Sequence, residues 1–578
     1  MVAPRADTLF EISWEACNKV GGIYTVIQTK LHEMQRLYPG YVLIGPDLGS
    51  REFEERKPPK KWKEVFNALA AEGIRCKYGV WLIPGEPTVV LIRSSMKDKD
   101  QHKAWLWKEF QIDSMHASYE FEEPLCFAVA AGKLIEQYAA KSKKRTVAHC
   151  HEWMTGFAAL HLKHVPNVAT VFTTHATMLG RTIAGNGHEL YDIIDTINPE
   201  EWAYKFNVQD KHLAEKACAH HADTFTTVSE ITGLEAEKLL GKKPDVLVYN
   251  GFNTERFPTF EETSLRHIKS KDMLKEFLAY MFFPYYTFDL DNTLMFFTSG
   301  RYEFRNKGID ILIDAIGTLN EELKGKNVPT VVMFFCVIMG KGGVRHDVLE
   351  NKNYYQHVRS TVDWHKKHLL QHLTLGLVSG KRDGTLVNDV LEKINENVSH
   401  FSREGLPPVA THDIPNAEDD PMLQSFHAHG LQNAQDDPVK VIIYPGYFDG
   451  SDGVLNLDYY DATVGMNLGI FPSAYEPWGY TPLESAVLGI PTITTDLAGF
   501  GRYVTCKERE GVTVLQREGT SREEVVTALK EELKAFILAD RNERVKKGFM
   551  AKSLADTCNW KTFITRYVEA HNLALERL

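Results

Sequence analysis

Residues 468–488 read LGIFPSAYEPWGYTPLESAVL, which is a short apolar strand, a polar loop and the start of a helix. The apolar run Leu468–Pro472 predicts a buried strand. At the helix start, Thr481 is suited to the N-cap and Glu484 to the third helical position, so the two predict a capping box. A strand that leads through a glycine-containing loop into a helix predicts an α/β fold, with the ligand at the strand end.

Short apolar runs alternate with helix-length amphipathic segments on both sides of this stretch, in two series. Such alternation is typical of βαβ units around a parallel sheet. The first series of predicted strands is Thr8–Ser13, Tyr41–Gly45, Thr88–Arg93, Thr146–Cys150, Ala169–Thr174, Thr224–Ser229 and Val246–Val248. The second is Leu294–Ser299, Val328–Met339, Val441–Tyr444, Leu468–Pro472 and Thr492–Thr494. We predict two Rossmann-like domains, over residues 1–262 and 263–559.

A helical insertion interrupts the second series from about Gly343 to Asp437. Its helical sequence includes Tyr354–Leu375 and Leu386–Ser399, and a polar segment follows. Such an insertion either provides subunit contacts or forms a solvated helical hairpin, and the sequence leaves both alternatives open.

Composition excludes several classes of protein. Among 578 residues, 66 Lys and Arg stand against 77 Asp and Glu, a net charge of −11 without a long basic run, which argues against a nucleic-acid partner. The eight cysteines are scattered without a C-x-x-C pair, so a disulfide framework and a zinc site are not expected. The longest apolar run, Val331–Met339, is half of what a membrane span needs. With no signal-peptide pattern at the N-terminus, we expect a protein of the reducing cytoplasm.

Two glutamates flank the loop that precedes the predicted helix at Thr481. Glu476 lies on the loop and Glu484 in the first helical turn. Both carboxylates can face one ligand, one accepting sugar hydroxyls and the other ribose hydroxyls, while the amides between them hold a diphosphate. Plain helix capping by Glu484 is the alternative, and it leaves Glu476 unexplained.

Two further segments bring cations and glycines to strand ends. Arg301 and Lys307 follow the strand Leu294–Ser299 and are suited to stabilising a diphosphate leaving group, although solvated surface cations fit the same pattern. Near the N-terminus, Lys19 precedes Gly21 and Gly22, whose backbone allows close approach of a phosphate or sugar. A simple tight turn is the alternative for the glycine pair.

Two further motifs suggest metal or phosphate chemistry: histidines at the ends of predicted strands, and an acidic motif similar to that of a phosphatase. His149 and His151 lack evident companion ligands, so we reject a zinc site there. Asp289-Leu290-Asp291-Asn292-Thr293-Leu294 matches the start of aspartate-nucleophile phosphatases, but no later acidic pair follows a buried strand to complete a magnesium site.

In this order, the segments resemble the animal and fungal type of glycogen synthase over most of the chain. The matching pieces are Asn18–Tyr24, Val80–Ile83, His151–Trp153, Phe172–Arg181, Phe225–Ser229, Asp289–Phe297, Gly300–Gly308 and Tyr475–Glu484. The resemblance implies a GT-B type fold of two Rossmann-like domains facing a cleft. It also implies transfer of glucose from UDP-glucose to the non-reducing 4-OH end of an α-1,4-glucan, glycogen or a malto-oligosaccharide, with retention and without cofactor or metal. A final helix, residues 560–578, would pack back on the first domain.

The resemblance also supplies roles for single residues. Those implied for catalysis are Arg181, Arg301 and Lys307 around the phosphates and leaving group, with Glu476 and His175 by the glucose. Those implied for donor binding or assigned to it above are Lys19, Gly21, Gly22, Asn250, Tyr447, Trp478, Gly479, Tyr480, Thr481 and Glu484. Retention would proceed through an oxocarbenium-like species, and a covalent intermediate on Glu476 is the competing proposal.

Regulation is where the sequence departs from the family. Regulated members carry a dense arginine helix that senses glucose 6-phosphate, whereas this chain has only Arg541 and Arg544 there and stops at Leu578 without a serine-rich tail. We therefore predict a largely constitutive enzyme. The family further implies a homo-oligomer, a tetramer through the helical insertion, and a glycogenin-like primer protein as a partner. A related enzyme using ADP-glucose or another acceptor and an inactive glycan-binding scaffold remain alternatives.

Overall fold

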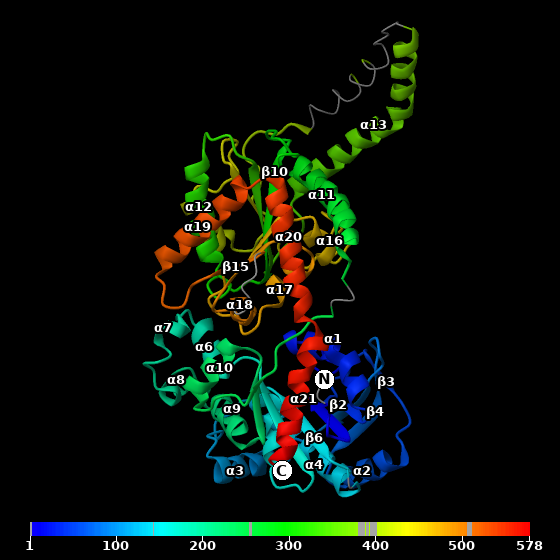
Figure 1. The fold of residues 1–578 in the computed structure, drawn as a ribbon, viewed down its shortest axis with the longest axis vertical. Helices are drawn as coiled ribbons and strands as arrows, with labels where there is room; N and C mark the ends of the chain where they lie inside the picture. The colour runs from blue at the N-terminus through cyan, green and yellow to red at the C-terminus, as the bar shows by residue number, and fades with distance from the viewer. Residues whose placement is uncertain are drawn as a thin grey trace.

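The computed structural model describes residues 3–142, 144–253, 257–379, 401–505 and 511–578, together with residues 388 and 392. Two α/β lobes lie one above the other, each built around its own sheet (Figure 1). Within the described residues, no helix combines the length and the apolar character needed to cross a membrane.

The sheet of the N-terminal lobe has nine strands in the order β3-β4-β5-β2-β1-β6-β7-β8-β9. In chain order they are β1 Thr8–Ile12, β2 Tyr41–Pro46, β3 Phe53–Glu55, β4 Arg75–Trp81, β5 Thr88–Arg93, β6 Thr146–His151, β7 Val168–Thr174, β8 Thr224–Thr227 and β9 Val246–Leu247. The predicted strands are all present. The seven predicted strands pair in parallel, as expected, and β3 and β4, which were not predicted, extend one edge of the sheet with antiparallel pairing.

The sheet of the C-terminal lobe has six parallel strands in the order β12-β11-β10-β13-β14-β15. They are β10 Thr293–Arg301, β11 Thr330–Ile338, β12 Val439–Ile443, β13 Leu468–Ile470, β14 Thr492–Thr495 and β15 Val512–Leu515. Parallel strands buried on both faces need nearly continuous apolar sequence, and β11 is buried over seven successive residues. The carboxyl ends of β10 and β13 meet where the strand order reverses, which is where α/β sheets bind ligands.

Helices cover both sheets. Those of the N-terminal lobe are α1 Gly22–Leu37, α2 Lys60–Ala71, α3 Lys99–Phe110, α4 Tyr119–Ala140, α5 Trp153–Leu162, α6 Met178–Gly185, α7 Leu190–Ile193, α8 Pro199–Lys205, α9 Gln209–His221 and α10 Glu230–Glu235. From α11 onward the helices are α11 Phe260–Phe282, α12 Ile309–Leu323, α13 His346–Ser379, α15 Pro421–Ala428, α16 Tyr459–Val464, α17 Tyr480–Val487, α18 Gly499–Thr505, α19 Arg522–Leu538, α20 Arg541–Ala555 and α21 Trp560–Glu576.

The insertion begins with one long helix that projects from the C-terminal lobe (Figure 1). This helix, α13, continues through the predicted helical segment 354–375. The second predicted helix, Leu386–Ser399, lies outside the described residues except for 388 and 392. Several large apolar side chains of α13 are exposed, among them Trp364 and Val378.

The last helix, α21, returns to the N-terminal lobe after α20 has packed on the C-terminal one (Figure 1). There it contacts α1 and the strands β6 to β9. Trp560 and Phe563 are buried with Trp478 and Phe500 in one apolar cluster, which therefore joins the two lobes. Burial of an aromatic side chain of this size stabilises such a junction by about 2 kcal/mol per residue.

Candidate active site between the lobes

A cavity of about 460 Å³ lies between the two lobes and gathers cations from both. The N-terminal lobe contributes Arg181 of α6, and the C-terminal lobe contributes Arg301 and Lys307 beside Glu476. The structure thus brings together four of the five residues predicted to be catalytic. Arg305 also lines the cavity, and in a chain of net negative charge four cations at one cavity form a local site for an anionic ligand.

Lys307 and Glu476 form an ion pair across this cavity, and both side chains are largely shielded from solvent. The turn that carries Lys307 ends at Gly308, whose φ is +65°. A Cβ there would lie 2.0 Å from the carbonyl oxygen of Pro472, so only glycine lets this turn approach the strand end that leads to Glu476. Arg301 is more open and pairs with Glu303 at 2.9 Å.

Arg181 faces a group of buried carboxylates. Burial raises the pKa of the Glu152 carboxyl to about 7, although the nearby Arg181 charge and two backbone amides lower it. Those amides belong to His175 and Ala176 and donate at 3.0 and 3.3 Å. Glu152 also has a φ of +65°, a left-handed conformation that is costly for a non-glycine residue and that concentrates at functional sites.

The glycine pair near the N-terminus is held by Glu15, a residue that sequence analysis missed. The Glu15 carboxylate accepts hydrogen bonds from the amides of Gly21 at 2.7 Å and Tyr24 at 2.9 Å. Gly21 is the N-cap of α1 and Gly22 its first residue, and both are exposed. Lys19 is exposed beside them. The Glu15 carboxylate therefore already caps the N-terminus of this sixteen-residue helix.

The predicted capping box of Thr481 and Glu484 is wrong. Helix α17 begins at Tyr480 with Gly479 as its N-cap, at a φ of +105°, and no side chain caps it. The glycine ahead of Thr481 can adopt this conformation, so the helix starts earlier than the Thr-Pro pattern indicates. Glu484 instead accepts a hydrogen bond from the Tyr460 hydroxyl at 3.1 Å, and burial raises the pKa of its carboxyl to about 7. It lines a second cavity, of about 290 Å³.

The remaining predicted donor residues are spread around the junction. The Trp478 ring is buried against Tyr249, Tyr503 and Phe563 and does not line the cavities that contain Glu476 or Glu484. Tyr480 is half-buried, and its hydroxyl lies 3.4 Å from the Gly251 carbonyl. Asn250 is buried, and its Oδ1 has no hydrogen-bond partner among the described residues. Tyr447 is exposed on the loop after β12, and Thr481 is partly buried in α17.

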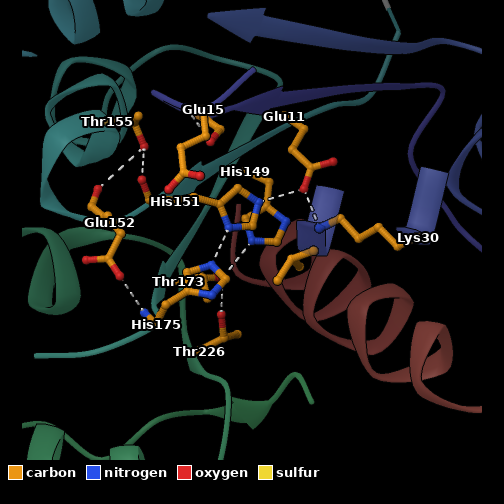
Figure 2. Close-up of polar contacts among 12 residues, drawn as sticks. Glu11, Glu15, Lys30, His149, His151, Glu152, Thr155, Thr173, His175 and Thr226 are labelled. Carbon is orange, nitrogen blue, oxygen red and sulfur yellow. Dashed lines mark hydrogen bonds and ion pairs between the residues drawn. The ribbon is translucent and has the colours of Figure 1, made fainter. Parts of the chain in front are cut away.

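His175 belongs to a buried polar cluster and does not line the cavity between the lobes (Figure 2). Its Nε2 lies 2.9 Å from Nδ1 of His151, and Nε2 of His151 lies 2.6 Å from Glu11. Glu11 also forms an ion pair with Lys30, and the side chains of Glu11, Lys30 and His151 are wholly buried. Lys30 holds the pKa of Glu11 well below its usual range against the effect of burial.

Glu11, His149 and His151 approach one another closely enough to hold a metal ion. The sequence argument that the two histidines lack a companion ligand is therefore wrong. The ring nitrogens that would bind the metal already form hydrogen bonds with protein groups. His149 is hydrogen-bonded to His571 at 3.0 Å and to Thr173 at 2.7 Å, and His151 is hydrogen-bonded to His175 and Glu11. Lys30 adds an ammonium ion to the same carboxylate. These residues form a hydrogen-bonded core and do not fit a cation site.

The buried histidines predict that acid destabilises the protein. Burial lowers the pKa of His571 to about 3, from an ordinary value of 6.5. Below pH 6.5 the His571 imidazole therefore binds a proton in the unfolded chain but not in the folded one. The free energy of unfolding falls as pH drops from about 6.5 towards 3. We expect wild type to lose about 1.4 kcal/mol more per pH unit below pH 6 than the variant His571→Gln.

Urea unfolding at pH 7.5, 6.5 and 5.5 measures this difference. Glu152 and Glu484 have raised pKa values and act in the opposite direction, stabilising the fold as pH falls from 7. They are common to both proteins, so the comparison isolates His571. Parallel pH curves for the two proteins would contradict the prediction.

A third cavity, of about 610 Å³, lies between α11 and α20 and contains the two predicted effector residues. Arg541 and Arg544 line it together with Lys271 and Lys275 of α11. Asp291, part of the phosphatase-like motif, pairs with Lys275 at 2.6 Å at this cavity. The Arg544 guanidinium already donates one hydrogen bond to the Ala539 carbonyl at 2.6 Å, so fewer of its N–H groups are available to a ligand.

Comparisons with known proteins agree with this geometry. A sequence model of the family described as glycogen synthase matches residues 11–578. The chain is 33% identical to the glycogen [starch] synthase of Neurospora crassa over 98% of its own length and 84% of that protein's. It is 34% identical to the liver glycogen [starch] synthase of Mus musculus, over 98% of this chain and 83% of that protein.

Among solved structures, the catalytic domain of starch synthase IV from Arabidopsis thaliana superimposes with a TM-score of 0.53 at 14% identity, over 99% of this chain and all of that one. This similarity concerns the fold, and it confirms the predicted GT-B arrangement of two α/β lobes. The family match covers nearly the whole chain, including both lobes and the cations between them. This chain belongs to the glycogen synthase family.

Proposed function

We propose that the protein transfers glucose from UDP-glucose to the non-reducing 4-OH end of an α-1,4-glucan, with retention of configuration. The observation that carries this proposal is the set of four cations that line the cavity between the lobes, among which Lys307 is paired with Glu476. A nucleoside diphosphate leaving group develops negative charge as its bond to the sugar breaks. Cations that are already fixed in place stabilise that charge without reorganisation.

In the proposed reaction the bond between the anomeric carbon and the diphosphate oxygen breaks, and the acceptor 4-oxygen bonds to that carbon. The acceptor proton passes to the leaving diphosphate, so products are UDP and a glucan longer by one glucose. Glu476 holds Lys307 in position and accepts glucose hydroxyls. Its ion pair with Lys307 makes its carboxylate a weaker nucleophile, which favours this role over the competing covalent mechanism.

The other donor contacts follow from the same placement. Gly22 and Lys19 at the start of α1 would face the phosphates, beside Gly21, whose amide donates to Glu15. Glu484 would accept ribose hydroxyls. We assign to the donor site as well Asn250, Tyr447, Trp478, Gly479, Tyr480 and Thr481. Because the chain supplies four cations to the cavity itself, we propose that no metal or other cofactor takes part.

A donor comparison tests the function. Purified protein is incubated with glycogen and either UDP-glucose or ADP-glucose, and both nucleotide release and glucose incorporation into precipitable glucan are measured. We expect incorporation from UDP-glucose to exceed that from ADP-glucose. Preference for ADP-glucose would support the related-enzyme alternative, and consumption of neither donor, with glycogen still bound, would support the glycan-binding scaffold.

We predict weak activation by glucose 6-phosphate. The cavity with Arg541 and Arg544 is where such an anion would bind, but the Arg544 guanidinium is already engaged with the end of α19. We expect saturating glucose 6-phosphate to raise the rate by no more than about 3-fold, which is below the usual range of allosteric coupling, about 5- to 150-fold. The assay compares wild type with the double variant Arg541→Ala, Arg544→Ala. A large activation that this variant abolishes would overturn the prediction.

We further propose a cytoplasmic homo-oligomer, a tetramer, that works from a glycogenin-like primer. The exposed Trp364 and Val378 of α13 support subunit contacts through this helix, since large apolar side chains are seldom left in water. Six of the described cysteines, Cys17, Cys76, Cys126, Cys150, Cys218 and Cys336, are free thiols, which fits a reducing compartment. Sedimentation should show a tetramer in wild type and smaller species in Trp364→Asp, Val378→Asp, and a monomeric wild type would contradict this assignment.

A further inference from the structure

Two hydrogen-bonded chains that contain histidines run through the buried cluster of Figure 2. The first runs from Glu11 through His151 to His175. The second runs from Thr173 through His149 and His571 to Tyr38. Both are fully or almost fully buried, so each ring nitrogen must donate or accept according to its neighbour.

The direction of the first chain follows from Glu11. A carboxylate only accepts, so Nε2 of His151 carries the proton that it shares with Glu11 at 2.6 Å. The carboxylate charge is already matched by the Lys30 ammonium, and Tyr41 donates a hydrogen bond to the same group. Burial and the Lys30 charge lower the pKa of His151, which keeps the ring neutral with a lone pair on Nδ1.

That lone pair decides the state of His175. Since His151 Nδ1 accepts, Nε2 of His175 at 2.9 Å must donate, and Nε2 carries its proton. Burial lowers the pKa of His175 well below its ordinary value, so the ring has no second proton. Its Nδ1 is therefore a bare acceptor, and within the described part of the chain no group donates to it.

We propose that Glu11 and His151 are positioning residues that fix the tautomer of His175, so that His175 Nδ1 accepts a hydrogen bond from one hydroxyl of the donor glucose. This inference rests on the proposed function, together with the sequence-based expectation that His175 lies by the glucose. It makes the relay a determinant of donor specificity: a sugar with a hydroxyl at that position is accepted. A sugar that lacks the hydroxyl, or presents an acceptor-only group such as a carboxylate, is disfavoured.

The test is a thermodynamic cycle between the relay and the sugar hydroxyls. The ratio of kcat/KM for UDP-glucose to that for each of its 2-, 3-, 4- and 6-deoxy analogues is measured in wild type, Glu11→Gln and His151→Asn. For the 4-deoxy donor a single turnover suffices. In wild type we expect one deoxy analogue to lose about 10-fold through the missing hydrogen bond to His175. In both relay variants that ratio should fall towards one, with the other ratios unchanged.

Tyr38→Phe is the matched control, because it removes one equally buried hydrogen bond from the second chain without touching the first. It should keep the wild-type ratios. Equal losses for all donors in folded relay variants would overturn the proposal, because a merely structural role affects every donor alike. If wild type uses no nucleotide-glucose at all, the proposed function fails, which is distinct from unchanged ratios in an active enzyme.

A second measurement does not depend on the variants folding. Nitrogen-15 spectra of histidine-labelled wild type distinguish a protonated ring nitrogen from a bare one, and His175→Gln identifies the signals of His175. We expect a proton on Nε2 and none on Nδ1. A proton on Nδ1 of His175 in the wild-type protein would overturn the proposal.

Discussion

Lys307→Ala is expected to lower kcat for glucose transfer by about 10²- to 10³-fold, the usual cost of removing one preorganised group that stabilises transition-state charge. The substitution removes a cation from the cavity between the lobes and leaves the Glu476 carboxylate without its partner. That carboxylate then repels the donor diphosphate, so KM for the donor should rise as well. Initial rates over a range of donor concentrations separate the two effects.

The control is Lys326→Ala, which removes an exposed cation at the end of α12 that pairs loosely with Glu322 at 3.9 Å. It should leave both kinetic constants unchanged. Glycogen binding by Lys307→Ala should also persist, since the cavity cations face the donor. If turnover survives in Lys307→Ala, the assignment of the leaving-group site to this cavity is wrong.

Lys30→Met is expected to lower the free energy of unfolding by about 3–5 kcal/mol, because it strands a buried carboxylate. Methionine keeps much of the volume of lysine but removes the ammonium that neutralises Glu11. Both side chains of this pair have no exposed surface. Urea unfolding at neutral pH measures the loss, and the double variant Lys30→Met, Glu11→Gln should recover part of it.

Lys133→Met provides the matched comparison on the surface. Lys133 pairs with Glu72 at 2.7 Å, but both side chains are partly solvated. Water screens such a pair, so we expect a loss below about 1 kcal/mol. Equal losses for Lys30→Met and Lys133→Met would show that burial of the Glu11 pair contributes nothing to stability.

Sequence analysis predicted the fold well where strands are buried on both faces. Twelve apolar runs became strands because burial in a parallel sheet requires continuous apolar sequence. It missed β3 and β4, since Glu54 and Glu55 on one and Arg75 and Lys77 on the other give an edge pair little apolar signal. It also missed β15, in which only the two end residues, Val512 and Leu515, are buried.

The candidate active site was predicted only in part, namely where its residues directly follow predicted strands. Arg301, Lys307 and Glu476 lie on loops after strands, where the topology alone brings them to one edge. The relay behind His175 was not predicted, because its members come from β1, α1 and β6 and meet only in three dimensions. The sequence did contain a signal for a buried ion pair. Glu11 is a charged residue in a strand whose five residues are all buried, and Lys30 lies on the buried face of α1.

The most direct test of the central claim is the stoichiometry and linkage of the product. Purified protein with UDP-glucose and maltohexaose, without added metal, should release one UDP for each glucose added and yield maltoheptaose with a new α-1,4 linkage. Chromatography of the oligosaccharides and proton NMR of the anomeric signals measure both. UDP release without chain growth, or a new linkage of β configuration, would contradict the account.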